Sequence, residues 1–314
     1  HQLRRRLLTL DGYFPYDFTI PLVRWDARYD YHTMLPAIVD AVAPLGADYQ
    51  ARMRRGFSER WIDVYENDGK RSGAYSAGVY GVHPYMLMNW ADTLDDVFTM
   101  AHEMGHSIHT MLSHETQPYV YSDYTIFVAE VASTLNEALL LDHLLERATS
   151  RDERVVLLQH AIDSITSTFY TQVMFADFEL QVHRRVERDE PVTADVLNQI
   201  YKELFVAYYG DSVDLEALTP ATWARIPHFF NSPFYVYQYA TCFASAAQIA
   251  ATITAGPEPA REAARQRYLT LLSSGGNAHP MVQLANAGVD LSRPDTVRAV
   301  VDQLDRLVTR LEQA

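Results

Sequence analysis

The chain has 314 residues, of which 48% are hydrophobic, so it is long enough to bury a sizeable core as one large domain or two closely packed ones. Its 26 lysine and arginine residues stand against 40 aspartate and glutamate residues, and the formal net charge of -14 argues against nucleic acid as a general partner. With Cys242 as the only cysteine, the chain can form no internal disulfide and no zinc site built on several thiolates. This cysteine usage fits a reducing compartment, and no apolar run approaches the roughly 20 residues of a membrane span, so we expect a cytoplasmic location with no membrane partner.

The first 90 residues predict irregular structure, then helix, then a small sheet. Residues 11–36 are rich in proline and tyrosine and predict an irregular segment, whereas the apolar spacing from about Asp26 to Arg60 is helical. Glycines and aromatic residues between Gly69 and Gly81 predict a short hairpin or an extended strand. The segment from His83 to Asn89 continues extended, and its proline suits an edge strand.

From residue 93 onward the apolar spacing predicts helices almost throughout. Pro257 and Pro294 suit first helical turns, and Gly210 and Gly275 stand where helices should stop. Because strands are confined to a small sheet, the fold class is mainly α with a minor β element, and no internal boundary divides residues 1–314 into domains. The predicted helices cover residues 93–113, 122–147, 151–187, 193–208, 231–253, 257–274 and 294–312.

His102-Glu103-Met104-Gly105-His106 is an HExxH motif inside a predicted helix. Residues four apart lie on one helix face, so the two imidazoles can converge on a single ion at Zn–N distances of about 2.0–2.1 Å. Glu103 is one position on from His102, so it can reach a water on the metal without occupying the metal, as a general base must. The alternative is a chance arrangement, but flanking apolar residues at helical spacing would turn the imidazoles inward, where unpaired polar groups are costly.

A catalytic zinc needs a third protein ligand and one open position. The extended metzincin motif would require glycine at position 109 and histidine at position 112, but the chain has His109 and Leu112 there, which excludes that class. We therefore expect the third ligand to be an acid on a following helix. The candidates are Glu115, Asp123, Glu130 and Glu137.

The surroundings of these acids differ. Glu115 follows the motif too soon to fold back onto the metal, whereas Glu130 lies in an apolar stretch, Phe127 to Ser133, that must be buried. A buried carboxylate needs a partner, and a metal or, alternatively, a salt bridge would supply one. Glu137 lies two turns beyond Glu130 on the same face, so it could accept a hydrogen bond from a zinc-bound histidine, or it could be an ordinary surface or inter-helix acid.

Several longer stretches add a family resemblance to this interpretation. The chain resembles the M3 family of zinc metallopeptidases, and within it the oligoendopeptidase F group, which implies a helical zincin-type catalytic domain with a small sheet beside the HExxH helix. The resemblance implies His102, His106 and Glu130 as ligands of one zinc ion per chain and Glu103 as the base. The matching stretches are GAYSAG (73–78), HPYMLMNW (83–90), TLDDVFTMAHEMGHSIHT (93–110), FVAEVASTLNEALL (127–140), PHFFNSPFYVYQYAT (227–241) and, more weakly, GGNAHPMVQLANAGVDLSRPD (275–295).

Members of this group are considerably longer than the present chain. They carry an N-terminal helical region that walls one side of a deep substrate channel. The resemblance therefore implies that residues 1–314 are the C-terminal catalytic portion, either cut down or naturally short, without that region.

An extended peptide can be held by adding itself to an exposed sheet edge. Segments 73–80 and 83–89 precede the zinc helix and are predicted to be extended, so we expect one of them to hydrogen-bond the backbone of a peptide substrate. The alternative is a sheet that serves only the core.

His228 is followed by three tyrosines at alternate positions, Tyr235, Tyr237 and Tyr239. Peptide hydrolysis builds negative charge on the former carbonyl oxygen, and each donor aimed at that oxygen contributes roughly 3–4 kcal/mol. Tyr235 and Tyr239 share a face if the segment is helical. The resemblance implies that a histidine and tyrosines here bind the substrate and stabilise the oxyanion; the alternative is aromatic packing.

These features predict a zinc-dependent endopeptidase that cuts internal bonds of short oligopeptides by activating water, with Glu103 as general base. One alternative is a peptidyl-dipeptidase or carboxypeptidase of the same chemistry, which needs a cationic clamp for the substrate C-terminus. Another is a catalytically weak zinc- or peptide-binding fragment. Other histidines and the cysteine are expected to be structural or surface residues: His83, His109, His114, His160 and Cys242.

Overall fold

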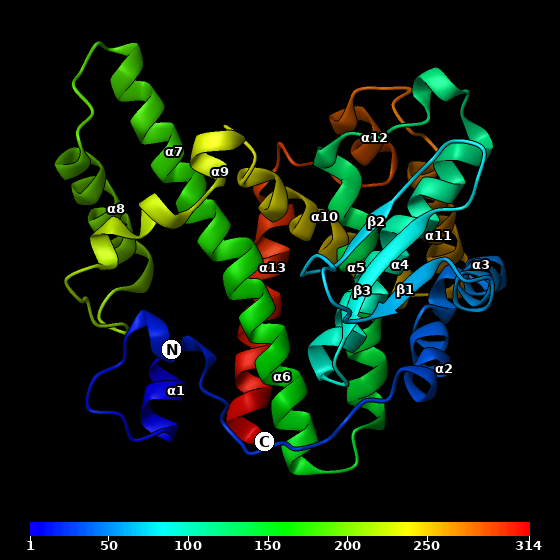
Figure 1. Cartoon of the computed structure of the whole chain (residues 1–314), viewed down its shortest axis with the longest axis horizontal. Coiled ribbons are helices and arrows are strands. Elements are labelled where there is room, and N and C mark those ends of the chain that lie inside the picture. Colours follow the sequence, from blue (N-terminus) through cyan, green and yellow to red (C-terminus); the bar gives the residue numbers. More distant parts are fainter. The chain divides into compact units, whose positions relative to one another are not determined.

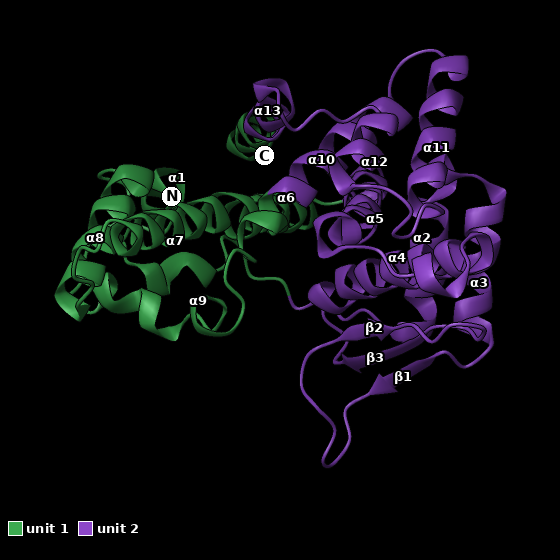
Figure 2. Cartoon of the chain, turned by 90° about the horizontal axis from the view of Figure 1, so that it is seen from above, with its two compact units in different colours: residues 1–25, 150–240, 304–314 green, residues 26–149, 241–303 purple.

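The computed structural model describes residues 1–314 and divides the chain into two compact units (Figure 2). Unit 1 comprises His1–Trp25, Ser150–Ala240 and Leu304–Ala314, and unit 2 comprises Asp26–Thr149 and Thr241–Gln303. Helices dominate both units, so the expected mainly α class with a small sheet is confirmed (Figure 1). The expectation of one catalytic domain over the whole chain stays a prediction.

The sheet belongs to unit 2 and has three short strands in the order β1–β3–β2. β1 (Ile62–Tyr65) pairs parallel with β3 (Tyr85–Trp90), and β2 (Tyr75–Ala77) pairs antiparallel with the other side of β3. Side chains alternate along β3, so Met86 and Met88 are buried while their neighbours are more exposed.

The position of β3 corrects one prediction and explains another. An edge strand at His83–Asn89 is wrong, because β3 is the central strand. Pro84 stands directly before the first residue of β3, so its missing N–H removes no hydrogen bond from the ladder. The strand expected between Gly69 and Gly81 is confirmed as β2, and it lies at the sheet edge.

Thr93 caps α4 (Leu94–Thr116), the helix that carries the HExxH motif. The Thr93 hydroxyl accepts a hydrogen bond from the Asp96 N–H, and the Asp96 carboxylate accepts one from the Thr93 N–H, which satisfies two otherwise unpaired donors. A 2.8 Å hydrogen bond between the hydroxyls of Ser76 and Ser107 ties β2 to this helix. The buried apolar residues of α4 are Val97, Phe98, Met100, Ala101, Met104, Ile108 and Met111.

The other helices of unit 2 match the predicted ones except in two places. The helix expected over 231–253 begins only at Tyr237, and the sequence analysis missed a short helix that begins at Pro280. α10 (Tyr237–Thr254) and α13 (Pro294–Gln313) contain residues of both units. The remaining helical elements of unit 2 are α2 (Tyr31–Ala41), η2 (Ala43–Leu45), α3 (Ala47–Ser58), η3 (Tyr119–Tyr121), α5 (Ile126–Arg147), α11 (Glu258–Leu272) and α12 (Pro280–Asn286).

Unit 1 packs its helices around an aromatic core that includes Phe175, Phe178, Tyr201 and Phe205. The long helix predicted for 151–187 is present, with a π-helical turn between its two parts. No helix of the chain is both long and apolar enough to cross a membrane. The helical elements of unit 1 are α1 (Gln2–Leu7), η1 (Pro15–Thr19), α6 (Arg151–Ile165), η4 (Thr166–Tyr170), α7 (Thr171–Glu187), α8 (Ala194–Tyr209), η5 (Thr219–Arg225) and α9 (His228–Asn231).

Candidate metal centre

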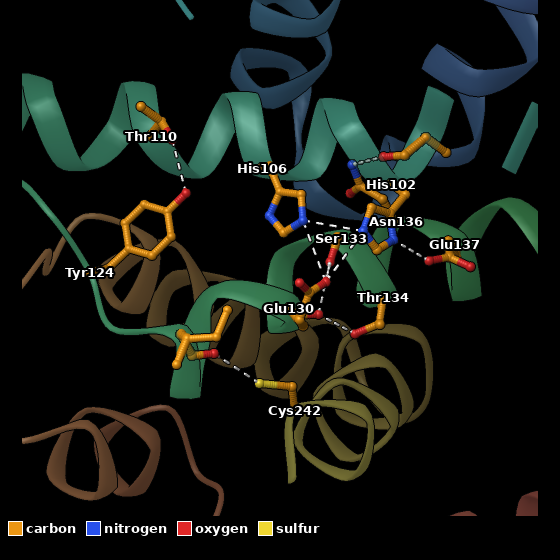
Figure 3. Close-up of polar contacts among 12 residues, drawn as sticks. His102, His106, Thr110, Tyr124, Glu130, Ser133, Thr134, Asn136, Glu137 and Cys242 are labelled. Carbon is orange, nitrogen blue, oxygen red and sulfur yellow. Dashed lines mark hydrogen bonds and ion pairs between the residues drawn. The ribbon is translucent and has the colours of Figure 1, made fainter. Parts of the chain in front are cut away.

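The HExxH motif lies where α4 packs along α5. The two helices run in opposite directions, because His106 meets Glu130 and, one turn earlier on α4, His102 meets Glu137 (Figure 3). Gly105 stands at their close approach: a Cβ at this position would lie only 2.7 Å from the carbonyl oxygen of Ala132. A side chain at position 105 would therefore push the two helices apart.

Three side chains at this interface bring one ligand atom each to a common point. The Nε2 atoms of His102 and His106 are 3.2 Å apart, and the Oε2 atom of Glu130 lies 3.3 Å from the first and 3.4 Å from the second (Figure 3). Ligand atoms held at about 2.0–2.1 Å by a tetrahedral ion lie about 3.3–3.4 Å from one another. The residues present therefore fit a zinc-sized cation, and all three are only partly buried.

Ser133 orients the Glu130 carboxylate. It lies three residues beyond Glu130 on α5, and its buried hydroxyl donates a 2.9 Å hydrogen bond to Oε2, the oxygen that faces both imidazoles. Ser133 was not among the predicted site residues. Its position three residues after a candidate ligand on the same helix was the signal that could have predicted this hydrogen bond.

Glu137 contacts the other side of His102. Its Oε1 atom lies 2.5 Å from His102 Nδ1, which leaves Nε2 facing Glu130 (Figure 3). When Nδ1 carries the proton and donates it to this carboxylate, the lone pair of Nε2 is free for a metal. Glu137 therefore lies where the helical spacing predicted it.

Glu103, the carboxylate of the motif, is buried, with only 6% of its surface exposed. Its Oε2 atom is buried without a hydrogen-bond partner in the protein. Burial raises the pKa of Glu103, and the positive charge of His102 and His106 opposes that rise. A buried carboxylate oxygen without a partner is costly, and a water molecule on a metal held by the motif would provide one.

The acids and the imidazoles of the site shift one another's pKa values. Burial alone would lower the pKa of His102, but hydrogen bonds to Glu130 and Glu137 raise it well above its ordinary value. Burial alone would raise the pKa of Glu130, but hydrogen bonds from His102 and His106 hold it well below its usual range. The arrangement thus stabilises positive charge between the helices, as a site for a divalent cation requires.

Three other polar residues near the motif, Glu115, His109 and Cys242, have contacts away from the three candidate ligands. Glu115, one of the four candidate ligands, pairs with Arg52 at 2.7 Å. His109 is fully buried and its ring stacks on Tyr124 at 3.6 Å between centroids. Burial lowers the pKa of His109 to about 3, so the imidazole is neutral in the folded protein. Cys242 is a buried core residue whose thiol donates to the carbonyl of Phe127.

The predicted oxyanion donors lie in unit 1 and form a cluster of their own. The ring of His228 stacks on Tyr235 at 5.2 Å and meets Tyr239 edge-on at 6.1 Å, and the two tyrosine rings are 5.3 Å apart. Tyr237, the third tyrosine of the run, is 38% exposed.

The sheet narrows the choice of a substrate strand. Both sides of β3 are paired, so segment 83–89 has no edge to offer a peptide. β2 lies at the edge and is tied to α4 through Ser76 and Ser107. Of the two segments considered, only 73–80 contains a strand that can accept another one.

The fold and the site define a class: a mainly helical protein in which two HExxH histidines meet a glutamate from the following helix. The model for peptidase family M3 matches residues 36–302. The chain belongs to peptidase family M3, and the predicted resemblance to its oligoendopeptidase F group is confirmed.

Curated relatives and solved structures agree with this assignment. The chain is 38% identical to oligopeptidase PepF of Bacillus subtilis and 41% identical to the chromosomal oligoendopeptidase F of Lactococcus lactis subsp. cremoris, over 99% of its length in both cases. These alignments cover 47% and 51% of the relatives, so the chain spans about half their length. The crystal structure of a Chlamydophila abortus protein matches with a TM-score of 0.89 at 37% identity, covering 99% of this chain and 51% of that one. The structure of oligoendopeptidase-F from Enterococcus faecium matches with a TM-score of 0.74 at 28% identity, covering 99% and 48%.

Proposed function

We propose that this chain is a zinc-dependent endopeptidase of short oligopeptides, with one zinc ion held by His102, His106 and Glu130. The observation that carries the proposal is the spacing of the three ligand atoms, which lie 3.2–3.4 Å from one another. Membership of family M3 and the oligopeptidase names of the relatives support a peptide substrate. Two imidazoles and one carboxylate favour zinc among the divalent metals.

Glu103 is the proposed general base. When bound, zinc would lower the pKa of a water toward about 7 and polarise the scissile carbonyl. The buried Glu103 carboxylate, whose pKa is raised by burial, takes the proton of the attacking water and later passes it to the leaving amine. Its unpartnered Oε2 atom is available for this water.

Two other groups handle the substrate in this proposal. The edge strand β2 binds the peptide backbone in extended form, which places few demands on side chains and suits varied oligopeptides. His228, with Tyr235 and Tyr239, donates hydrogen bonds to the oxygen on which negative charge develops.

Substitution of the proposed base tests this function. Glu103→Gln keeps the size of the side chain but cannot accept a proton, so zinc content should stay at one per chain while turnover of an internally quenched oligopeptide is nearly abolished. Glu115→Gln, on the same helix but bound to Arg52, is the matched control and should keep its activity.

The same assay separates the alternatives. A chelator should abolish the wild-type activity and added zinc should restore it, and mass spectrometry should find cleavage at internal bonds. Full turnover by Glu103→Gln would refute the assigned base. Stoichiometric zinc without any hydrolysis by the wild-type chain would contradict catalysis by these residues alone.

A further inference from the structure

Asn136 is a fully buried polar residue on α5 that the proposed chemistry does not use. Its side-chain oxygen accepts a 3.0 Å hydrogen bond from the hydroxyl of Tyr49 on α3, and its Nδ2 atom donates a 3.0 Å hydrogen bond to the carbonyl of Ala101 on α4. One amide therefore joins three helices. Because each hydrogen bond uses a different end of the amide, its orientation is fixed.

The hydrogen bond between Asn136 and Ala101 joins two residues that lie directly beside metal-site residues in the chain. Ala101 precedes His102, and Asn136 precedes Glu137 (Figure 3). The Asn136–Ala101 hydrogen bond and the His102–Glu137 contact of 2.5 Å are thus adjacent links between the same two helix turns. A shift of α5 along α4 or about its own axis cannot break one link without straining the other.

A second contact sits one turn away on both helices. Gly105 is four residues beyond Ala101, and Ala132 is four residues before Asn136; the two backbones touch there with no room for a Cβ. This backbone contact sets how closely the helices approach. It is not directional, however, and apolar packing tolerates small slips that a buried hydrogen bond does not.

We propose that Asn136, held by Tyr49, is a positioning residue that fixes the register of α5 against α4, so that Glu130 and Glu137 contact the histidines in the geometry that binds zinc. The inference rests on the proposed metal site and extends it to residues that touch no ligand. Partners behind metal ligands typically change metal affinity by about 10–100-fold when they are removed. We expect an effect of that size from Asn136 through its hold on Glu130 and Glu137.

The test separates positioning from stability by using a pair of variants. Asn136→Leu removes the amide oxygen that accepts from the buried Tyr49 hydroxyl, which should lower both stability and zinc affinity. In the double variant Asn136→Leu/Tyr49→Phe both polar partners are gone, so much of the stability should return. The double variant still lacks the hydrogen bond from Asn136 to Ala101 that fixes the register of α5 against α4. Its zinc affinity should therefore remain about 10–100-fold weaker than that of the wild type.

The measurements use the 314-residue chain. Urea unfolding of the metal-free protein gives stability, competition with a chromophoric chelator gives zinc affinity, and the visible spectrum of bound Co²⁺ reports ligand geometry. Asn89→Leu is the matched control, because the Asn89 amide also donates to backbone carbonyls of unit 2, those of Arg71 and Gly73. It should lower stability and leave the cobalt spectrum unchanged.

Zinc affinity that recovers together with stability in the double variant would overturn the positioning role and leave Asn136 as an ordinary core residue. An unchanged cobalt spectrum in the double variant would overturn it too. A wild-type chain that binds no zinc, or a His106→Ala variant that binds it as tightly as the wild type, would overturn the proposed metal site itself. The two failures are therefore distinguishable.

Discussion

The α4–α5 interface and the segment from His228 to Tyr239 both gather polar side chains, but they do so by different means. At the interface, two long helices in register set every distance, and hydrogen bonds such as Asn136–Ala101 support the candidate ligands from behind. In the segment, a four-residue helix and turns lead up to Tyr237, and ring contacts join the side chains.

The irregular segment has its own backbone anchor. Phe234 adopts a left-handed conformation with φ of 58°, and its N–H donates a 2.7 Å hydrogen bond to the buried carboxylate of Glu179 on α7. Such a conformation is unfavourable for a bulky residue and persists only when its surroundings hold it. The candidate metal centre thus depends on the packing of two long helices, whereas the tyrosine cluster depends on one strained turn.

Among variants that keep their zinc, those that remove a proposed hydrogen-bond donor from the His228 segment should lower kcat the most. His228→Ala or Tyr239→Phe should lower kcat by about 10²–10³-fold, because each removes a donor to the developing oxyanion, while zinc content stays at one per chain. Steady-state kinetics on an internally quenched peptide and metal analysis of the same samples measure both quantities.

Tyr237→Phe is the control for this prediction, since Tyr237 is exposed whereas Tyr235 and Tyr239 are part-buried. It should retain near wild-type kcat. If Tyr237→Phe alone lowers kcat, then Tyr237, and not Tyr235 or Tyr239, is the tyrosine that contacts the substrate.

A smaller effect should follow from Glu137→Gln at the α4–α5 interface. Loss of this carboxylate should weaken zinc binding by about 10–100-fold at high pH, because His102 loses the partner that orients its ring and strengthens Nε2 as a ligand. Competition titrations over a range of pH measure it.

The difference in zinc affinity between Glu137→Gln and the wild type should depend on pH. In the wild type the raised pKa of His102 means that a proton competes with zinc from well above the ordinary histidine range. Without Glu137 that pKa falls and the proton competes less, so the affinity gap between variant and wild type should narrow as the pH is lowered. A gap that stays constant with pH would indicate a purely structural role for Glu137.

The sequence predicted those parts of the site that follow helical periodicity. His102 and His106 are four apart, Glu130 and Glu137 are seven apart, and the structure places all four at one interface. Their neighbours were not predictable in the same way. The bond between Asn136 and Tyr49 joins residues 87 positions apart, and no local pattern specifies such a pair.

Irregular backbone limited the remaining predictions. Helical spacing over 231–253 suggested a helix, but the chain makes turns until Tyr237, and the contact between the rings of Tyr235 and Tyr239 forms across the start of the helix. The central position of β3 was missed because Pro84 was taken as part of the strand, whereas it ends the preceding loop. Pairing order in a sheet depends on contacts between segments, which the composition of one segment does not reveal.

The central claim is that His102, His106 and Glu130 hold one zinc ion between α4 and α5. Crystals of the chain grown with zinc, measured above and below the zinc absorption edge, test it most directly. The account predicts a single anomalous peak about 2.0–2.2 Å from the Nε2 atoms of both histidines and from a carboxylate oxygen of Glu130. Bound zinc whose peak lies elsewhere, or a peak at the histidines with Glu130 turned away, would contradict it.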